Sequence, residues 1–317
     1  MIYFFMKYLV FFIVCLNLSG DIQPYLKAAP DKLGDHSFEG VDFVYMINLD
    51  QRPEKWERSF LQLQLYGINP YRFSAVNGWE LSLEDLNDLG LQFLPGMQGG
   101  GWGTCYNAYG NFEPSHEIVQ TYGKTYFSHC MSRGAIGIVL SHVSVLKDAY
   151  DSGYRTIWVM EDDIEILKDP SLVSDRIKQL DELVGEDNWD ILFTDRDLRD
   201  ANGRYSIVSW PSQRPDYPVY SVGNEYTLNR PVSSDFRQIG ARYGAHSMIV
   251  RRSGIEKILN FFLEHQVFLP YDIEYILPKG IRMFTVLDDI VSNTPKAPSD
   301  NGGPNYLNRK LGAIPLF

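Results

Sequence analysis

The sequence has few basic residues, few cysteines and no internal repeat. Its 317 residues include 29 lysines and arginines against 40 aspartates and glutamates, which gives a formal net charge of −11. Non-specific binding to nucleic acid depends on clustered basic side chains that displace counterions, so this composition argues against a nucleic-acid partner. An acidic ligand such as a nucleotide diphosphate would need a bound cation or a few well-placed basic groups.

Only three cysteines are present, Cys15, Cys105 and Cys130, and their spacing does not suggest a zinc site. Cys15 lies in the apolar N-terminal segment, which leaves Cys105 and Cys130 as the pair available to the folded protein. These two residues could form a disulfide or remain independent thiols, because spacing alone does not show that their Cα atoms approach each other.

One long apolar run stands at the N-terminus, where residues 1–20 carry a single charge at Lys7. The core of this run has the length of a signal peptide rather than of a membrane span. We therefore expect export to the secretory pathway or cell envelope, with cleavage after Ser19 or the following glycine. An uncleaved signal anchor that associates the protein with a membrane, including its cytoplasmic face, is the alternative. Residues 21–40 are predicted to be a linker.

Strand and helix patterns alternate from residue 41 onward, in a chain with 44% hydrophobic residues. Helices are predicted to begin near Pro53 and Ile136, after an N-cap at Asp169, and at a capping box formed by Ser253 and Glu256. Strands are predicted at 41–49, 71–76, 156–160, 189–193, 243–250 and 282–286. The alternation predicts an α/β fold, with a mostly parallel, Rossmann-related sheet and helices on both faces.

Two stretches lack these periodic patterns. Residues 79–133 are rich in glycine and aromatic residues and are predicted to be a loop-rich insert, and residues 196–242 a surface excursion. Trp79 and Trp102 in the insert could stack on sugar rings or simply pack within it. One domain over residues 41–295, followed by a tail over 296–317, is the simplest partition.

Three adjacent acids, Glu161, Asp162 and Asp163, follow the apolar strand at 156–160. Ligands of α/β sheets bind at the carboxyl ends of strands, and alternation along an extended segment places Glu161 and Asp163 on one side and Asp162 on the other. Carboxylates suit magnesium or manganese, which can also bridge a diphosphate. The alternative is a solvated acidic turn.

Four sequence blocks carry a resemblance to a known family. They are VYMINLDQRPEKWER at 44–58, AVNG at 75–78, GAIGIVLSH at 134–142 and VMEDD at 159–163, and a later block at 243–275 adds to them. In this order they resemble glycosyltransferase family 25, which includes bacterial lipooligosaccharide galactosyltransferases and collagen galactosyltransferases.

The resemblance implies a fold of the GT-A type and an inverting, metal-dependent hexosyltransferase. The family typically transfers galactose from a UDP-sugar, with Mn²⁺ (or Mg²⁺), to a glycan or to a glycosylated or hydroxylated protein. It places Asp163 and Glu161 at the metal, although the sequence reads Glu-Asp-Asp where a strict Asp-x-Asp is expected. It also places near the nucleotide the residues Asn48, Leu49, Arg52, Val76, Asn77 and Asp162.

Inversion requires a carboxylate that takes the proton of the acceptor hydroxyl. Asp272 is the favoured candidate, and a turn residue or a helix N-cap is its alternative role. Asp195 is the second candidate, although Asp195-Arg196-Asp197 is more typical of an ion-paired loop. His142 is interpreted as a scaffold residue. A non-catalytic, glycan-binding relative that keeps the fold is the competing hypothesis for function, and a sugar-nucleotide hydrolase is a third.

Overall fold

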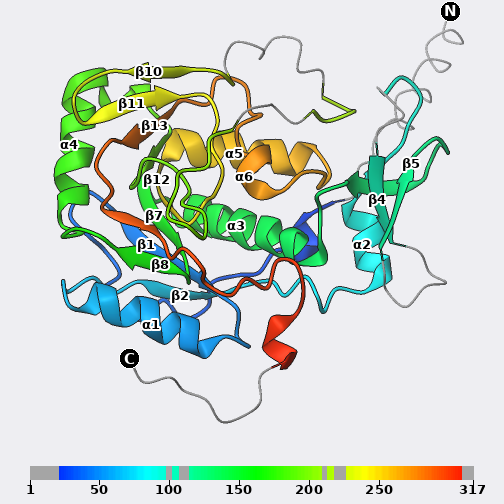
Figure 1. Cartoon of the computed structure of the whole chain (residues 1–317), viewed down its shortest axis with the longest axis horizontal. Coiled ribbons are helices and arrows are strands. Elements are labelled where there is room, and N and C mark those ends of the chain that lie inside the picture. Colours follow the sequence, from blue (N-terminus) through cyan, green and yellow to red (C-terminus); the bar gives the residue numbers. More distant parts are fainter. Residues whose placement is uncertain (1–20, 98–101, 107–113, 209–212, 218–225, 309–317) are drawn as a thin grey trace, which may run out of the picture.

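An eight-stranded sheet organises the computed structural model, which describes residues 21–97, 102–106, 114–208, 213–217 and 226–308 (Figure 1). The strand order is β10-β11-β13-β9-β12-β7-β1-β2. The bounds of these strands, in chain order, are β1 Phe43–Asn48, β2 Tyr71–Ser74, β7 Thr156–Glu161, β9 Ile191–Phe193, β10 Asn229–Pro231, β11 Phe236–Ile239, β12 Ser247–Arg251 and β13 Met283–Val286.

The sheet is mixed. The pairings β1·β2, β1·β7 and β13·β9 are parallel, whereas β12·β7, β12·β9, β11·β13 and β10·β11 are antiparallel. These pairings mean that β11 and β12 run against the other strands. The α/β class predicted from the sequence is confirmed. Most strands of this sheet point the same way, as predicted, but most neighbouring pairs are antiparallel, because the reversed strand β12 lies between β7 and β9.

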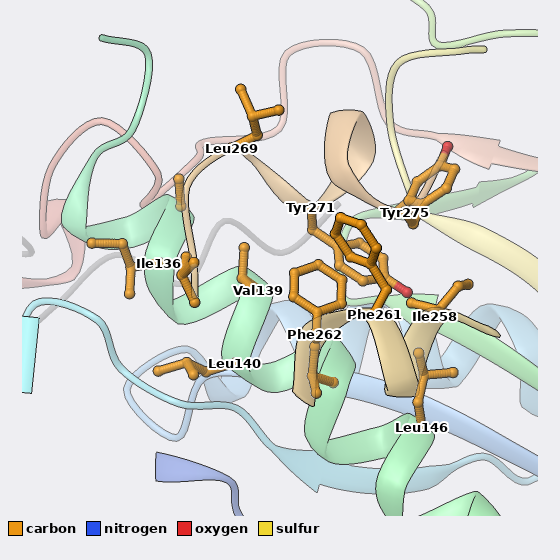
Figure 2. Close-up of a cluster of buried hydrophobic side chains, with 14 of the residues drawn as sticks. Ile136, Val139, Leu140, Leu146, Ile258, Phe261, Phe262, Leu269, Tyr271 and Tyr275 are labelled. Atoms are coloured by element: carbon orange, nitrogen blue, oxygen red, sulfur yellow. The ribbon is translucent and has the colours of Figure 1, made fainter. Parts of the chain in front are cut away.

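Helices cover both faces of the sheet, as predicted. Alternate residues of the buried strand β1 enter two apolar clusters, with Tyr45 and Ile47 in one and Val44 and Met46 in the other. The first cluster includes side chains from α3 (Arg133–Asp151), α5 (Arg252–Glu264) and α6 (Tyr271–Glu274), whose contacts Figure 2 shows. The second includes side chains from α1 (Pro53–Gln64) and α4 (Leu172–Val184). Burial on both faces explains why β1 reads as a nearly continuous apolar run.

Two predicted helix starts are wrong. Helix α4 has Ser171 as its N-cap residue, and Asp169 accepts the Ser171 N–H at 2.9 Å outside the helix. Helix α5 begins at Arg252, and no capping box forms because Ser253 donates its hydroxyl proton to Asp190 on another element. In both cases a side chain suited to capping is used by a different contact.

The segment predicted as a loop-rich insert contains more regular structure than its sequence suggests. It holds helix α2 (Leu83–Leu89) and a small sheet of order β3-β6-β4-β5, formed by Leu91–Gln92, Thr125–Ser128, Trp102–Tyr106 and Pro114–Ile118. In Figure 1 this unit lies at one end of the molecule, beside the main sheet. Trp102 is 60% exposed there, and the intervening residues 98–101 and 107–113 lie outside the described part.

The remaining connections also differ from the sequence prediction. The excursion at 196–242 supplies β10 and β11 to the main sheet, and β8 (Ile164–Ile166) pairs with β14 (Val291–Asn293). Residues 21–40, expected to be a linker, pack on the domain and contain η1 (Gln23–Tyr25). Cys105 and Cys130 are both free thiols. Within the described residues no helix is long and apolar enough to span a membrane, and the apolar segment at 1–20 lies outside them.

Candidate functional site

The acidic triplet lies at the edge of the sheet where parallel strands β1, β2 and β7 end. Glu161 is the last residue of β7 and stands opposite Ile47 in the register with β1. Because the carboxyl ends of parallel strands meet at one edge, this pairing brings Asp162 beside Asn48, the last residue of β1. The site is thus built by strand pairing between segments more than 100 residues apart.

Asp162 is held from the side of helix α1. Asn48 donates an amide proton to Asp162 Oδ2 at 2.6 Å, Lys55 Nζ lies 3.4 Å from Oδ1, and Ser59 donates its hydroxyl proton to the Asp162 backbone carbonyl at 2.8 Å. Burial raises the pKa of Asp162 to about 6, although the charge of Lys55 opposes this rise. Asn48 itself is buried, and its amide also donates a hydrogen bond to the Arg52 carbonyl, so it links Asp162 to the start of helix α1.

Glu161 and Asp163 border one cavity more than Asp162 does. Both line two adjoining cavities, whereas Asp162 lines only the first. Burial opposes ionisation of Glu161, but the contact with His142, whose Nε2 lies 3.0 Å from Glu161 Oε1, outweighs it and lowers the pKa of Glu161. Burial and the charge of Glu161 raise the pKa of Asp163. The strand ends at Glu161, and Asp162 and Asp163 lie in the turn that follows, so the extended alternation predicted for the triplet does not describe its backbone.

The first cavity collects several residues predicted to lie near the nucleotide. Leu49, Val76 and Asn77 line it together with Asp162, and Gly78 and Trp79 continue the same wall. The chain at Gly78 passes so close to helix α3 that an added Cβ would lie 1.8 Å from the carbonyl oxygen of Arg133. A glycine is therefore required where this wall meets α3.

Arg52 does not line that cavity. Its guanidinium is buried, forms an ion pair with Asp300 and lies 2.7 Å from Glu54. Asp300 belongs to a segment that the sequence marks only as a tail. Residues 299–301 lie over the boundary between the two cavities, because Ser299 and Asn301 line both of them.

Two further contacts fix this C-terminal segment. Trp79 donates its indole proton to the Asp300 carbonyl at 2.7 Å, and Ser132 donates its hydroxyl proton to the Asn301 carbonyl at 2.5 Å. An added Cβ at Gly134 would lie 2.5 Å from the same Asn301 carbonyl oxygen. No local pattern in the sequence points to these residues, since the contacts that join them to Arg52, Trp79 and Ser132 are made across the fold. We refer to residues 299–301 as the C-terminal strap.

Asp272 lines the second cavity together with Glu161 and Asp163. It lies in the first turn of α6, where Pro270 is the N-cap residue, and the Gly244 N–H donates to its Oδ2 at 2.8 Å. Burial raises the pKa of Asp272. A carboxyl group with a raised pKa on a cavity wall suits the role of a proton acceptor.

Asp195 has a different environment. It has no exposed surface and, among the described residues, does not belong to the lining of either cavity. Arg242 lies 2.9 Å from its Oδ1, and His246 Nε2 and the Ser292 hydroxyl lie 2.8 and 2.7 Å from its Oδ2. Burial alone would raise the pKa of Asp195, but Arg242 and the other donors hold it well below its usual range.

The Asp195-Arg196-Asp197 segment is ion-paired, although not internally. Arg196 lies 3.4 Å from Asp289, and Asp197 pairs with Arg237. His246, which binds Asp195, is a residue that the sequence analysis missed. It precedes β12, and its carbonyl accepts the Glu161 N–H at 3.0 Å. Only the antiparallel pairing of β12 with β7 brings it to the site, so no local motif could have identified it.

With this geometry established, comparison with known proteins supplies the family. Residues 41–198 match the family model described as "Glycosyltransferase family 25 (LPS biosynthesis protein)". The matched stretch contains the triplet and the wall of the first cavity. Residues 41–198 belong to glycosyltransferase family 25. The resemblance drawn from the four sequence blocks is thereby confirmed.

The names of the relatives describe both glycosyltransferases and proteins called inactive. A "Glycosyltransferase 25 family member" from Aedes aegypti is 28% identical over 210 residues, which cover 66% of this chain and 29% of the relative. The human "Procollagen galactosyltransferase 2" is 30% identical over 135 residues, 43% of this chain and 17% of its own. The human "Inactive glycosyltransferase 25 family member 3" is 27% identical over 159 residues, 50% and 22% respectively. In each of these three relatives, less than a third of the length is matched.

Proposed function

We propose that this protein is a hexosyltransferase of the GT-A type that transfers galactose from UDP-galactose, with inversion, to a hydroxyl group of a glycan or protein. The observation that carries the proposal is the sharing of Glu161 and Asp163 by two adjoining cavities. A transferase needs a donor site and an acceptor site that meet at the reacting bond. The name of the human procollagen galactosyltransferase supports the choice of galactose.

The first cavity is proposed to hold the nucleotide. Its wall at Val76, Asn77 and Trp79 combines an apolar side chain, an amide and an aromatic ring, a set that suits a base and a ribose. Arg52 is proposed to act through the strap rather than on the phosphate, because its guanidinium is paired with Asp300.

Glu161 and Asp163 are proposed to hold Mn²⁺ or Mg²⁺. Among the described residues no three His, Cys, Asp or Glu side chains form a group that could hold a metal ion. Such ions, however, are often bound by one or two carboxylates and the substrate phosphates. The raised pKa of Asp163, caused by burial and by the charge of Glu161, supports this proposal, because a cation would offset both effects. A cation held there would neutralise charge on a departing diphosphate.

Asp272 is proposed as the base that accepts the proton of the acceptor hydroxyl. It lies on the wall of the second cavity, and its raised pKa favours proton transfer near neutral pH. Asp195 is not proposed as the base, because its carboxylate is enclosed and bound by Arg242, His246 and Ser292. The N-terminal apolar segment supports action in the secretory pathway or cell envelope.

A second candidate function is supported by the relatives. The human family member named inactive aligns with half of this chain, so a glycan-binding protein without transferase activity is the competing proposal. The two proposals differ at the nucleotide. A glycan-binding protein has no need of UDP, whereas a transferase must bind UDP and a cation together.

Thermal unfolding with UDP, with MnCl₂ and with both tests the proposal. Ligands that bind only the native state raise the melting temperature, and we expect the pair together to raise it more than the sum of the two alone. Asp163→Ala should abolish the joint effect. Asp187→Ala is the matched control, since Asp187 is an exposed acid that precedes β9, at the opposite edge of the sheet from the triplet. No shift with millimolar UDP and Mn²⁺ would favour the glycan-binding protein.

A further inference from the structure

His246 has one ring nitrogen without a partner on the wall of the second cavity. The side chain is 3% exposed, and its Nδ1 atom is buried without a hydrogen-bond partner among the described residues. The residues that line this cavity include His246, Glu161, Asp163 and Asp272. Buried polar atoms are nearly always paired, so an unpaired nitrogen beside the carboxylates requires an explanation.

The neighbours of His246 determine which ring nitrogen carries the proton. Asp195 Oδ2 lies 2.8 Å from Nε2. Arg242 and Ser292 also bind this carboxylate, and these contacts outweigh burial and hold the pKa of Asp195 well below its usual range, so it is ionised. An ionised carboxylate can only accept hydrogen bonds, so Nε2 must be the donor.

The neutral ring with its proton on Nε2 presents a lone pair at Nδ1. A side chain at residue 244 would crowd Nδ1, because a Cβ added to Gly244 would lie 3.0 Å from Nδ1 and 3.2 Å from Leu198, and both Gly244 and Leu198 belong to the cavity wall.

We propose that His246 Nδ1 accepts a hydrogen bond from a sugar hydroxyl bound in the second cavity, and that Asp195 fixes the tautomer that makes this possible. The proposal rests on the proposed hexosyl transfer and extends it to a residue that recognises the sugar. A hexose carries several hydroxyl groups that can donate a hydrogen bond. Sites that bind a substrate hydroxyl discriminate strongly against analogues without it. Asp195 is then a positioning residue for His246 and not the base.

Nitrogen-15 NMR of histidine side chains tests the proposal directly. In the free protein we expect the His246 signals of the Nε2–H tautomer, assigned by their loss in His246→Asn. With Mg²⁺ present, UDP should leave Nδ1 unchanged, whereas UDP-galactose, or UDP with free galactose, should shift it upfield as it accepts a hydrogen bond. A shift with UDP-galactose would show that the hydroxyl belongs to the sugar being transferred. A shift with UDP and free galactose would show that it belongs to the sugar that accepts the transfer. A proton on Nδ1 in the free protein would overturn the proposal, as would a signal that neither sugar moves.

Variants of the carboxylate separate positioning from general stability. In Asp195→Asn, Arg242 should orient the amide oxygen toward itself, so the amide NH₂ faces His246 and moves the ring proton to Nδ1. The sugar-induced shift should then disappear, and the KM for the sugar should rise roughly 10-fold. Ser292→Ala removes another donor to the same carboxylate and should leave the tautomer unchanged. If Asp195→Asn does not fold, the proposal is tested by the His246 tautomer and the sugar-induced Nδ1 shift of the wild-type protein.

The outcomes also separate this proposal from the proposed function. If UDP and Mn²⁺ raise the melting temperature but no sugar moves Nδ1, transfer stands and the role of His246 is refuted. If galactose moves Nδ1 while UDP has no effect on melting, the hydroxyl site stands and the nucleotide-dependent function fails. If neither is observed, both proposals fall.

Discussion

Arg52 and Asp300 form a buried ion pair although they stand 248 positions apart in the chain. Each side chain is 5% exposed. The pair joins the loop after β1 to the C-terminal strap, and the strap lies where the two cavities meet. A residue that the sequence predicts to lie near the nucleotide therefore holds a segment that lines the same cavities as the acidic triplet.

Asp300→Asn should destabilise the protein strongly. Removing one partner of a buried ion pair leaves the other charge uncompensated and typically costs about 3 to 5 kcal/mol, and Glu54 beside Arg52 places the expected loss at the lower end. Urea unfolding measures this change. Asp288→Asn is the control, because Asp288 pairs with Lys168 at a half-exposed position and should cost about 1 kcal/mol at most. Equal losses in the two variants would contradict the anchoring of the strap.

Asp272→Asn and Asp195→Asn should have separable effects. Loss of a general base typically lowers turnover about 10²- to 10⁴-fold, so Asp272→Asn should do so with UDP affinity and stability nearly unchanged. Asp195→Asn leaves buried Arg242 without its counter-charge and should lower the free energy of unfolding by about 3 kcal/mol. Steady-state kinetics and urea unfolding of both variants provide the test. Normal turnover in Asp272→Asn would remove it from the reaction.

Trp79 and Trp102 should differ in their effect on UDP binding. Trp79→Phe keeps an aromatic ring in the first cavity but loses the hydrogen bond to the strap, which is worth about 1 kcal/mol. We therefore expect UDP affinity to fall about 5-fold. Trp102 is 60% exposed and lies outside the lining of the two cavities, so Trp102→Ala should leave UDP affinity unchanged. Titration calorimetry that ranks the two variants the other way would place the small sheet over the nucleotide.

Asp216 should make stability depend on acid. Burial opposes its ionisation, but His265, 3.3 Å away, and Arg214, 3.0 Å away, lower the pKa of Asp216 to about 2. A carboxyl whose pKa is lower in the folded state stabilises the protein above its unfolded pKa, about 4, and loses that contribution as the pH falls toward 2. Wild type should exceed Asp216→Asn by about 2 kcal/mol in urea unfolding at pH 7. The difference should shrink below pH 4, and a constant difference down to pH 3 would contradict the assignment.

The sequence predicted the parts of the fold that depend on local pattern. The apolar runs of β1 and β7 and the helical spacing of α1 and α3 reflect burial against neighbours, which any packing of those elements preserves. The position of the acidic triplet after β7 followed from the end of the apolar run at Met160. Such features can be predicted without knowing which segments contact each other in the fold.

The sequence could not reveal contacts made across the fold. Ser253 has the spacing of a capping residue, yet its hydroxyl binds Asp190. His246 reaches the site only through the pairing of β12 with β7, and Asp300 only through a segment that looks like a polar tail. Local propensity is a weak guide wherever a tertiary partner offers the same side chain a better bond.

Residues 21–40 pack on the domain and do not form a flexible tether. Ile22 is 3% exposed within the main apolar cluster, the Lys27 backbone N–H donates to the Ser144 hydroxyl, and Lys32 pairs with Asp148 on α3. Residues 21–40 are therefore part of the folded surface. If the domain were anchored to a membrane ahead of residue 21, these residues would add no flexible length between the anchor and the domain, so the domain would have little freedom to move away from the bilayer.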